Sequence, residues 1–365
     1  MTTAPQPAIA YFISAHGLGH AARAAAVMDA VHQAQPAVRF EIFSTVPHWF
    51  FDDCLSWPFG YHALKTDVGL VQRTPLEVNL PATIEALNAF YPLDEQMVRT
   101  WAHQFRSLNC RLVICDIAPL GIAVAQKAGL PSLLIENFTW DWIYAGYKDY
   151  LSSLKPHIEY LASLFARADY HVQTEPFCAA GSPNLVVPPI GRPPRTPVDE
   201  IRHQLGVPTG KQLVVLTLGG TATSVGPFHT GDVPKEIFLV IPGNSDRVEQ
   251  TGSILRLPVR SDVYHPDLIS AADAVIGKAG YSTLAEIYLA DVPFGYLSRR
   301  DFREAPVLET YTRDNLRSLK VPAAALAGGS WMSLVPTLTA LPASGANRMN
   351  GADSTAAFVL DLLSQ

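Results

Sequence analysis

The chain has 365 residues, of which 48% are hydrophobic and 16% are charged, and its formal net charge is −6. This length exceeds what one ordinary core accommodates, so it predicts two domains that each bury a substantial core. The slight acidity and the lack of a basic cluster argue against nucleic acid as a partner. The sequence contains no signal-peptide pattern and no apolar run of about 18 residues, which predicts no membrane span and leaves peripheral membrane association open.

The cysteine pattern bears on redox state and on metal binding. Four cysteines occur without C-x-x-C or zinc-ligand spacing, namely Cys54, Cys110, Cys115 and Cys178. We therefore expect reduced thiols, no structural zinc and a cytoplasmic location.

Apolar strands alternate with helical patterns along the first half, which predicts a parallel α/β sheet. The predicted strands lie near 8–14, 39–45, 111–116, 132–135 and 170–173. The predicted helices lie near 20–34, 81–107, 119–128 and 151–167. The segment 47–79 is aromatic and rich in turn residues, so we expect a long irregular loop over the site, with Asp67 and Gln72 as minor candidates for acceptor contact.

A proline-rich stretch at 188–197 predicts a stiff connection that acts as a hinge. A second α/β pattern follows, with a helix opening near Val198. Its predicted strands lie near 212–218, 237–241, 253–257 and 274–276, and the chain ends in a predicted helix near 354–364. The expected domains are therefore 1–187 and 198–350, followed by a terminal segment, 351–365.

A glycine-rich turn follows the first predicted strand. Gly17, Gly19 and Ala22 match the loose dinucleotide pattern G-x-G-x-x-A, which raises a dehydrogenase as an alternative. The acid that such a site needs is missing, because Glu41 lies inside the next strand instead of at its carboxyl end. Two histidines flank the glycines, which indicates site chemistry other than nicotinamide binding.

His20 is the candidate general base at this turn. A neutral imidazole at a helix start can take a proton from a hydroxyl, and the positive end of the helix dipole disfavours its charged form. The alternative is that His20 only positions the turn. His16 and His20 have i, i+4 spacing, but no third ligand stands out, so we expect no metal. Arg23 is a candidate for binding phosphate or for pairing with a surface acid.

Polar residues follow two further strands of the first half. Asp116 ends its strand, where it can orient an acceptor, orient His20 or cap the next helix, and it is the alternative base. Asn137, Trp140 and Asp141 come after the next strand, and an aromatic ring beside polar groups can stack on a sugar. Trp140 can equally fill core.

A second glycine turn lies in 272–286, where a short buried strand precedes a helix start. Gly277 and Gly280 surround the turn, and its unpaired N–H groups and helix dipole suit a phosphate. Ser282 and Thr283 are expected to cap the helix and donate hydroxyls. Glu286 lies near the face that a nucleotide sugar would reach, or is an ordinary solvated carboxylate.

The run from Asp267 to Phe294 resembles the donor-binding segment of GT-B glycosyltransferases, in particular the branch of the peptidoglycan N-acetylglucosaminyltransferase. His16–Arg23, Asn137–Tyr144 and Arg300–Pro306 resemble the glycosyltransferase-like half of plant arabinokinases. The resemblance implies two Rossmann-like doubly wound domains facing across a cleft, with the terminal helix crossing back to the first domain.

The same resemblance implies roles in binding the donor. Gly280, Ser282 and Thr283 would hold the pyrophosphate, and Glu286 would take the ribose hydroxyls. Three residues, Gly219, Gly220 and Thr221, would form a second anion site. Asp301 follows the strand 294–297, where related transferases place an acid against the donor sugar, although the surrounding Arg-Asp-Phe-Arg-Glu departs from the glutamine-containing turn of many relatives.

The expected function is transfer of a hexosyl or N-acetylhexosaminyl group from a nucleoside diphosphate donor, with a UDP-sugar favoured, to an unidentified hydroxyl acceptor. Inversion without a metal or other cofactor is expected, because helix N-termini can stabilise the leaving diphosphate. A sugar-nucleotide epimerase of the same fold and a non-catalytic module that binds a sugar nucleotide remain alternatives.

Overall fold

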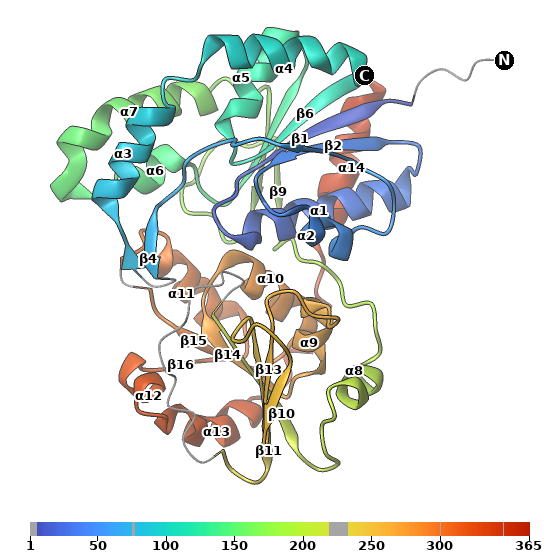
Figure 1. Ribbon diagram of the computed structural model, residues 1–365, viewed down its shortest axis with the longest axis vertical. Helices are drawn as coiled ribbons and strands as arrows, with labels where there is room; N and C mark the ends of the chain where they lie inside the picture. The colour runs from blue at the N-terminus through green and yellow to red at the C-terminus, as the bar shows by residue number, and fades with distance from the viewer. Residues whose placement is uncertain (1–5, 75–76, 219–232, 300, 346) are drawn as a thin grey trace. The chain divides into compact units, whose positions relative to one another are not determined.

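The computed structural model describes residues 6–74, 77–218, 233–299, 301–345 and 347–365 (Figure 1). The chain forms two units. The N-terminal unit comprises Met1–Val71, Val78–Ile190 and Asn350–Gln365, and the C-terminal unit comprises Gln72–Glu77 and Gly191–Met349. None of the described helices is long and apolar enough to span a membrane.

The N-terminal unit is built on a parallel sheet with the strand order β3-β2-β1-β6-β7-β8-β9. Every residue of the central strand β1 is buried, as expected for a parallel strand covered on both faces. The strands of this sheet are β1 (Ala8–Ile13), β2 (Arg39–Ser44), β3 (Gly60–Ala63), β6 (Cys110–Asp116), β7 (Ser132–Glu136), β8 (Tyr170–Thr174) and β9 (Leu185–Val187).

Helices cover both faces of this sheet. Phe12 of β1 stacks on Phe43 of β2 with ring centroids 4.5 Å apart, and Phe105 of α4 meets Phe12 edge-on. Helix α4 also packs against α5, whereas α1 packs against α14 (Figure 1). The helices are α1 (Leu18–Ala34), α2 (His48–Cys54), α3 (Leu80–Phe90), α4 (Glu95–Ser107), α5 (Pro119–Ala128), α6 (Trp140–Tyr144), the 3₁₀ helix η1 (Lys148–Tyr150), α7 (Leu151–Phe165) and α14 (Gly351–Ser364).

Two expectations for the first half are wrong. The segment 47–79 is not an irregular loop, because it contains α2 and β3, and α2 buries Phe50 and Phe51. It also contains a small two-stranded sheet made of β4 (Gln72–Thr74) and β5 (Glu77–Val78). The predicted helix 81–107 is two helices, since Pro92 lies between them and the side chain of Asp94 caps the second.

The C-terminal unit contains a sheet with the strand order β12-β13-β11-β10-β14-β15-β16, in which β12 pairs antiparallel and the other pairs are parallel. Its strands are β10 (Gln212–Thr217), β11 (Ile237–Pro242), β12 (Glu249–Thr251), β13 (Ile254–Leu257), β14 (Ala274–Lys278), β15 (Phe294–Leu297) and β16 (Ser318–Lys320). Its helices are α8 (Val198–Gln204), α9 (His265–Ala271), α10 (Tyr281–Ala290), α11 (Ala305–Asn315), α12 (Ala323–Ala327), the 3₁₀ helix η2 (Ser330–Leu334) and α13 (Val335–Thr339).

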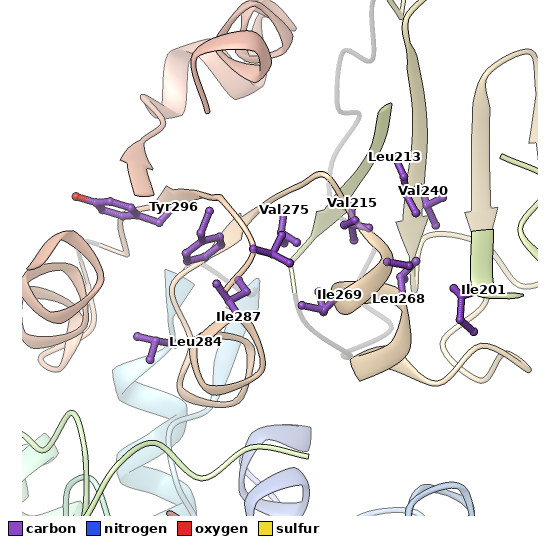
Figure 2. Packing of buried hydrophobic residues seen from close by; sticks show 14 of the residues in the cluster. Ile201, Leu213, Val215, Val240, Leu268, Ile269, Val275, Leu284, Ile287 and Tyr296 are labelled. Atoms are coloured by element: carbon purple, nitrogen blue, oxygen red, sulfur yellow. The ribbon is translucent and has the colours of Figure 1, made fainter. Parts of the chain in front are cut away.

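Alternation along β10 separates two apolar cores in this unit. Leu213 and Val215 point to one face of the sheet, and Val214 and Leu216 point to the other. Figure 2 shows the first core, in which strand residues meet side chains of α9 and α10, including Leu284. The second core is closed by η2 and α13. With buried apolar residues on both faces of each parallel sheet, the two units are Rossmann-like α/β units.

The final helix belongs by its contacts to the N-terminal unit. Helix α14 packs against α1, β6 and β9, and Asn350 caps its first turn through the N–H of Ala352 at 3.1 Å. The N–H of Gly351 donates to the carbonyl of Pro189 at 3.2 Å. These contacts tie the end of the chain to the segment that leads out of the N-terminal unit.

We predict that Gly351→Ala destabilises the N-terminal unit, because an added Cβ would lie 2.1 Å from the carbonyl oxygen of Pro188. Overpacking against backbone typically costs about 1–3 kcal/mol. Hydrogen exchange of α14 and thermal unfolding measure the effect. Gly181→Ala is the control, since its added Cβ would have no neighbour closer than 3.7 Å. Equal stability of the two variants would contradict the prediction.

Candidate functional site

The first glycine turn connects β1 to α1 at the carboxyl edge of the N-terminal sheet. Gly17 is the N-cap of α1 with φ of 78°, a conformation that favours glycine, and His20 is the third residue of the helix. Gly19 lies within the first turn of α1. The turn therefore places His20 above the carboxyl ends of the central strands.

Asp116 occupies the carboxyl end of the neighbouring strand β6. It pairs in register with Ile13, the last residue of β1, so both strands end at the same level. The Nδ1 atom of His20 lies 2.8 Å from Oδ1 of Asp116, which is completely buried. The structure thus joins two predicted site residues that are 96 positions apart in the chain.

Arg23 binds the same carboxylate from the second turn of α1. Its Nε donates to Oδ2 of Asp116 at 2.7 Å and its Nη2 donates to Oδ1 at 2.6 Å, a bidentate pair. Its Nη1 donates to Oδ1 of Asn137. Arg23 is only 5% exposed, so the expectation that it binds phosphate or pairs with a surface acid is wrong: its partner is a buried acid of the site.

The charge of Arg23 determines the state of this carboxylate. Burial alone would raise the pKa of Asp116, but the charge of Arg23, together with the hydrogen bonds from Arg23 and His20, holds that pKa below its ordinary value. An ionised carboxylate accepts hydrogen bonds and cannot donate them, so a hydrogen bond between Oδ1 of Asp116 and Nδ1 of His20 requires the imidazole proton on Nδ1. Asp116 is completely buried and lies against His20, which fits the role of orienting His20, and its role as alternative base stays a prediction.

Trp140 is a core residue and not an exposed stacking platform. Its ring is 1% exposed, and its Nε1 donates to Oδ2 of Asp67 at 2.8 Å. Burial raises the pKa of Asp67, although hydrogen bonds from Ser14 and Trp140 oppose the increase. The N–H of Leu70 donates to Nδ1 of His16 at 3.3 Å. Burial of the ring therefore supports the alternative that Trp140 fills core.

The remaining predicted residues of this unit differ in accessibility. Asn137 is buried and braces Arg23, as described above. Asp141 lies in the first turn of α6 and is partly buried, which raises its pKa. Among the described residues, no group of three His, Cys, Asp or Glu side chains could hold a metal ion.

The second glycine turn lies at the carboxyl end of β14 in the C-terminal unit. Gly280 is the N-cap of α10, and an added Cβ there would meet nothing within 4 Å. No side chain caps this helix, so the expected capping by Ser282 and Thr283 is wrong; they are its second and third residues. Gly277 lies inside β14, where an added Cβ would lie 2.2 Å from the carbonyl oxygen of Thr217, so it serves close strand packing.

Lys278, at the end of β14, is a cation that the sequence reasoning missed. Burial, reinforced by the charge of Arg299 and opposed by Glu304, lowers the pKa of Lys278 to about 8. Arg299 follows β15, with its guanidinium 3.2 Å from the ring centroid of Phe302 and 3.6 Å from Glu304. The signal in the sequence was a lysine directly before Ala279-Gly280, at the start of a helix.

Glu286 is buried within an ion-pair cluster and is 3% exposed. Its Oε1 accepts from Nε and Nη2 of Arg192 at 3.1 and 2.6 Å, and its Oε2 lies 2.7 Å from Nδ1 of His265. Glu286 is therefore not a solvated carboxylate, whereas its contact with ribose hydroxyls stays a prediction. Glu286 instead holds Arg192, in the connecting segment, against α10.

The connecting segment is attached further along by Asp267 of α9, whose Oδ1 accepts from the backbone N–H groups of Arg195 and Thr196 at 2.6 and 3.2 Å. Most of the proline-rich stretch 188–197 is thus fixed to the C-terminal unit, and its action as a hinge stays a prediction. Asp301 is exposed after β15. Gly219, Gly220 and Thr221 lie outside the described residues.

The chain resembles glycosyltransferases of known structure over nearly its whole length. It superposes on MurG of Acinetobacter baumannii with a TM-score of 0.54 and 16% identity, covering 98% of this chain and 100% of that one. A UDP-glucosyltransferase of Polygonum tinctorium gives a TM-score of 0.60 and 13% identity, with both chains fully covered. The chain has the GT-B fold.

One curated relative is similar in sequence. L-arabinokinase of Arabidopsis thaliana is 27% identical over 308 residues, which cover 82% of this chain and 29% of the relative. The chain thus spans less than a third of that relative's length. No family model matches the chain.

We predict that the Glu286 cluster makes stability depend on acid pH. Arg192 and His265 outweigh burial and lower the pKa of Glu286 from 4.5 to about 2. The contribution of the pair is therefore complete above pH 4.5 and declines as the pH falls toward 2. At neutral pH, Glu286→Gln should destabilise the protein by about 3–5 kcal/mol, because it leaves Arg192 buried without its anion.

Thermal unfolding of the wild type and the variant between pH 7 and pH 2 measures this contribution, with Glu95→Gln in the exposed pair Glu95–Arg99 as the control. The difference in unfolding temperature between the wild type and Glu286→Gln should become smaller as the pH falls from 4.5 toward 2. A variant that unfolds at the wild-type temperature at neutral pH would show that the cluster contributes nothing.

Proposed function

We propose that this protein is a glycosyltransferase that moves a sugar from a nucleoside diphosphate donor, with a UDP-sugar favoured, to a hydroxyl acceptor, with inversion and without a metal. The observation that carries the proposal is the pair of His20 and Asp116, in which a buried, ionised carboxylate holds Nδ1 of an imidazole and leaves Nε2 as the base. The structural likeness to MurG and to a UDP-glucosyltransferase supports the same reaction class.

In the proposed reaction, Nε2 of His20 accepts the proton of the acceptor hydroxyl while its oxygen attacks the anomeric carbon. A new C–O bond forms to the acceptor, and the bond from the anomeric carbon to the diphosphate oxygen breaks. The diphosphate leaves with the bonding electron pair, and Asp116 stabilises the imidazolium that forms. A positioned base contributes typically about 10²–10⁴-fold to such a step.

The N-terminus of α10 is the proposed site for the leaving diphosphate. The first-turn N–H groups after Gly280 have no side-chain cap, and Lys278 ends the strand that leads into them. The ammonium group of Lys278 could add positive charge there, and the hydroxyl of Ser282 could add a donor. Arg192 and His265 hold the carboxylate of Glu286, and the contact of that carboxylate with the donor ribose stays a prediction.

Incubation with UDP-glucose, UDP-galactose and UDP-N-acetylglucosamine, with and without monosaccharide and glycolipid acceptors, tests the proposal. Acceptor-dependent release of UDP and a product of increased mass support a transferase, and the anomeric coupling in proton NMR reports inversion. Conversion of one donor to its epimer without acceptor would favour an epimerase. Binding of UDP without turnover would favour a non-catalytic module.

We predict that His20→Gln lowers kcat at least about 100-fold and leaves the Kd for UDP within twofold, because the base acts only in the chemical step. Asp116→Asn should also lower kcat, since a neutral amide can donate to Nδ1 and so reverse the tautomer. Steady-state kinetics and calorimetry with UDP measure both effects. His48→Gln is the control, because His48 is an exposed histidine in an i, i+4 pair. Full activity of His20→Gln would contradict the proposed base.

A further inference from the structure

The carboxylate of Asp116 is shared between the histidine and an arginine. Oδ2 accepts from Nε of Arg23 and Oδ1 accepts from Nη2 of Arg23. Nδ1 of His20 lies 2.8 Å from Oδ1 of Asp116 and 3.3 Å from Nη2 of Arg23. All three side chains are buried, with Arg23 at 5% and His20 at 9% exposure. In a dry site, a carboxylate that had only the imidazole as partner would be free to take a proton, since burial disfavours its charge.

Arg23 is itself held in place by a second polar contact. Its Nη1 donates to Oδ1 of Asn137, and Nδ2 of Asn137 donates to the carbonyl oxygens of Thr174 and Pro176 at 2.6 and 3.0 Å. Two carbonyls can only accept, so the amide of Asn137 must turn its nitrogen toward them and its oxygen toward Arg23. The guanidinium group of Arg23 is therefore held by Asp116 on one side and by Asn137 on the other.

We propose that Arg23, braced by Asn137, is a positioning residue that keeps Asp116 ionised and so fixes the tautomer of His20, with the proton on Nδ1 and with Nε2 ready to accept. A protonated Asp116 would donate to Nδ1 and place the imidazole proton on Nε2, and such an imidazole cannot act as a base there. The catalytic part of the inference rests on the proposed function; the tautomer part does not.

Charged and titratable groups of neighbouring elements surround the side chains of Asp116, His20 and Arg23. Asp67, after β3, interacts electrostatically with both His20 and Asp116, and its Oδ2 accepts from Trp140. Glu136 of β7 and Tyr11 of β1 interact with Arg23. Of these groups, Arg23 is the cation that binds the Asp116 carboxylate directly, and its charge is the largest influence that lowers the pKa of Asp116 against the effect of burial.

The shape of Arg23 matters as well as its charge. A guanidinium offers a rigid fork of donors that serves Asp116 with two nitrogens and Asn137 with the third. A lysine ammonium keeps the charge and loses this parallel pair. Arg23→Lys should therefore retain more of the wild-type tautomer than Arg23→Met, which removes both the charge and the fork.

Nitrogen-15 NMR of histidine-labelled protein at pH 8 tests the inference directly, because Nδ1 and Nε2 shifts distinguish the two tautomers. We expect the wild type to hold His20 with its proton on Nδ1, Arg23→Met to show a substantial Nε2-protonated fraction, and Arg23→Lys to lie between. His20→Gln assigns the signal. Arg99→Met, at an exposed arginine paired with Glu95, should leave the spectrum unchanged.

Kinetics provide the second readout. If the proposed function holds, Arg23→Met should lower kcat at least tenfold and leave the Kd for UDP within twofold, with partial recovery in Arg23→Lys. A wild type that transfers no sugar refutes the proposed function, and the NMR result still decides the role of Arg23. If Arg23→Met does not fold, the comparison of Arg23→Lys with the wild type decides. An unchanged His20 tautomer in every folded Arg23 variant would overturn the inference.

Discussion

The buried carboxylate of Asp116 is the interaction on which the N-terminal site depends. It lies at the end of β6, beside the end of β1, where it receives donors from His20 and Arg23. Burial of one charge becomes tolerable because a second buried charge is hydrogen-bonded to it in a bidentate pair. The same pairing keeps the carboxylate a hydrogen-bond acceptor only, which favours the His20 tautomer with its proton on Nδ1. The ion pair of Asp116 with Arg23 thus underlies both the packing of the site and the proposed chemistry.

The C-terminal unit uses a buried carboxylate for a different purpose. Glu286 lies on α10, the helix whose first turn is the proposed diphosphate site, but its carboxylate binds Arg192 and His265. Arg192 lies in the segment that leads out of the N-terminal unit, and Asp267 holds the residues that follow. The helix that would bind the donor is therefore the helix that anchors the connecting segment. In this unit the first turn of α10 has no side-chain cap, whereas Leu284, Glu286 and Ile287 of the same helix are buried.

Much of the fold follows from local pattern. Alternating apolar strands and helical stretches indicated two parallel α/β units, and the central strands of both sheets lie close to their predicted positions. The division of 81–107 into two helices and the elements inside 47–79 were missed, because short elements depend on tertiary burial more than on periodicity. Candidate residues at strand ends were easier to predict than these short elements. The carboxyl ends of parallel strands meet at one edge of the sheet, however long the sequence between them is.

The sequence by itself determined the class of fold and the two glycine turns, and it singled out His20 as a candidate base, because turn chemistry and strand periodicity are local properties. Only the tertiary structure decided the partners of the charged residues. Arg23 and Asp116 are 93 positions apart, and Arg192 and Glu286 are 94 apart, so no local spacing shows that either pair forms. Whether a carboxylate binds solvent, a ligand or a buried arginine depends on which donors the fold brings within 3 Å of it and on how much water the packing excludes.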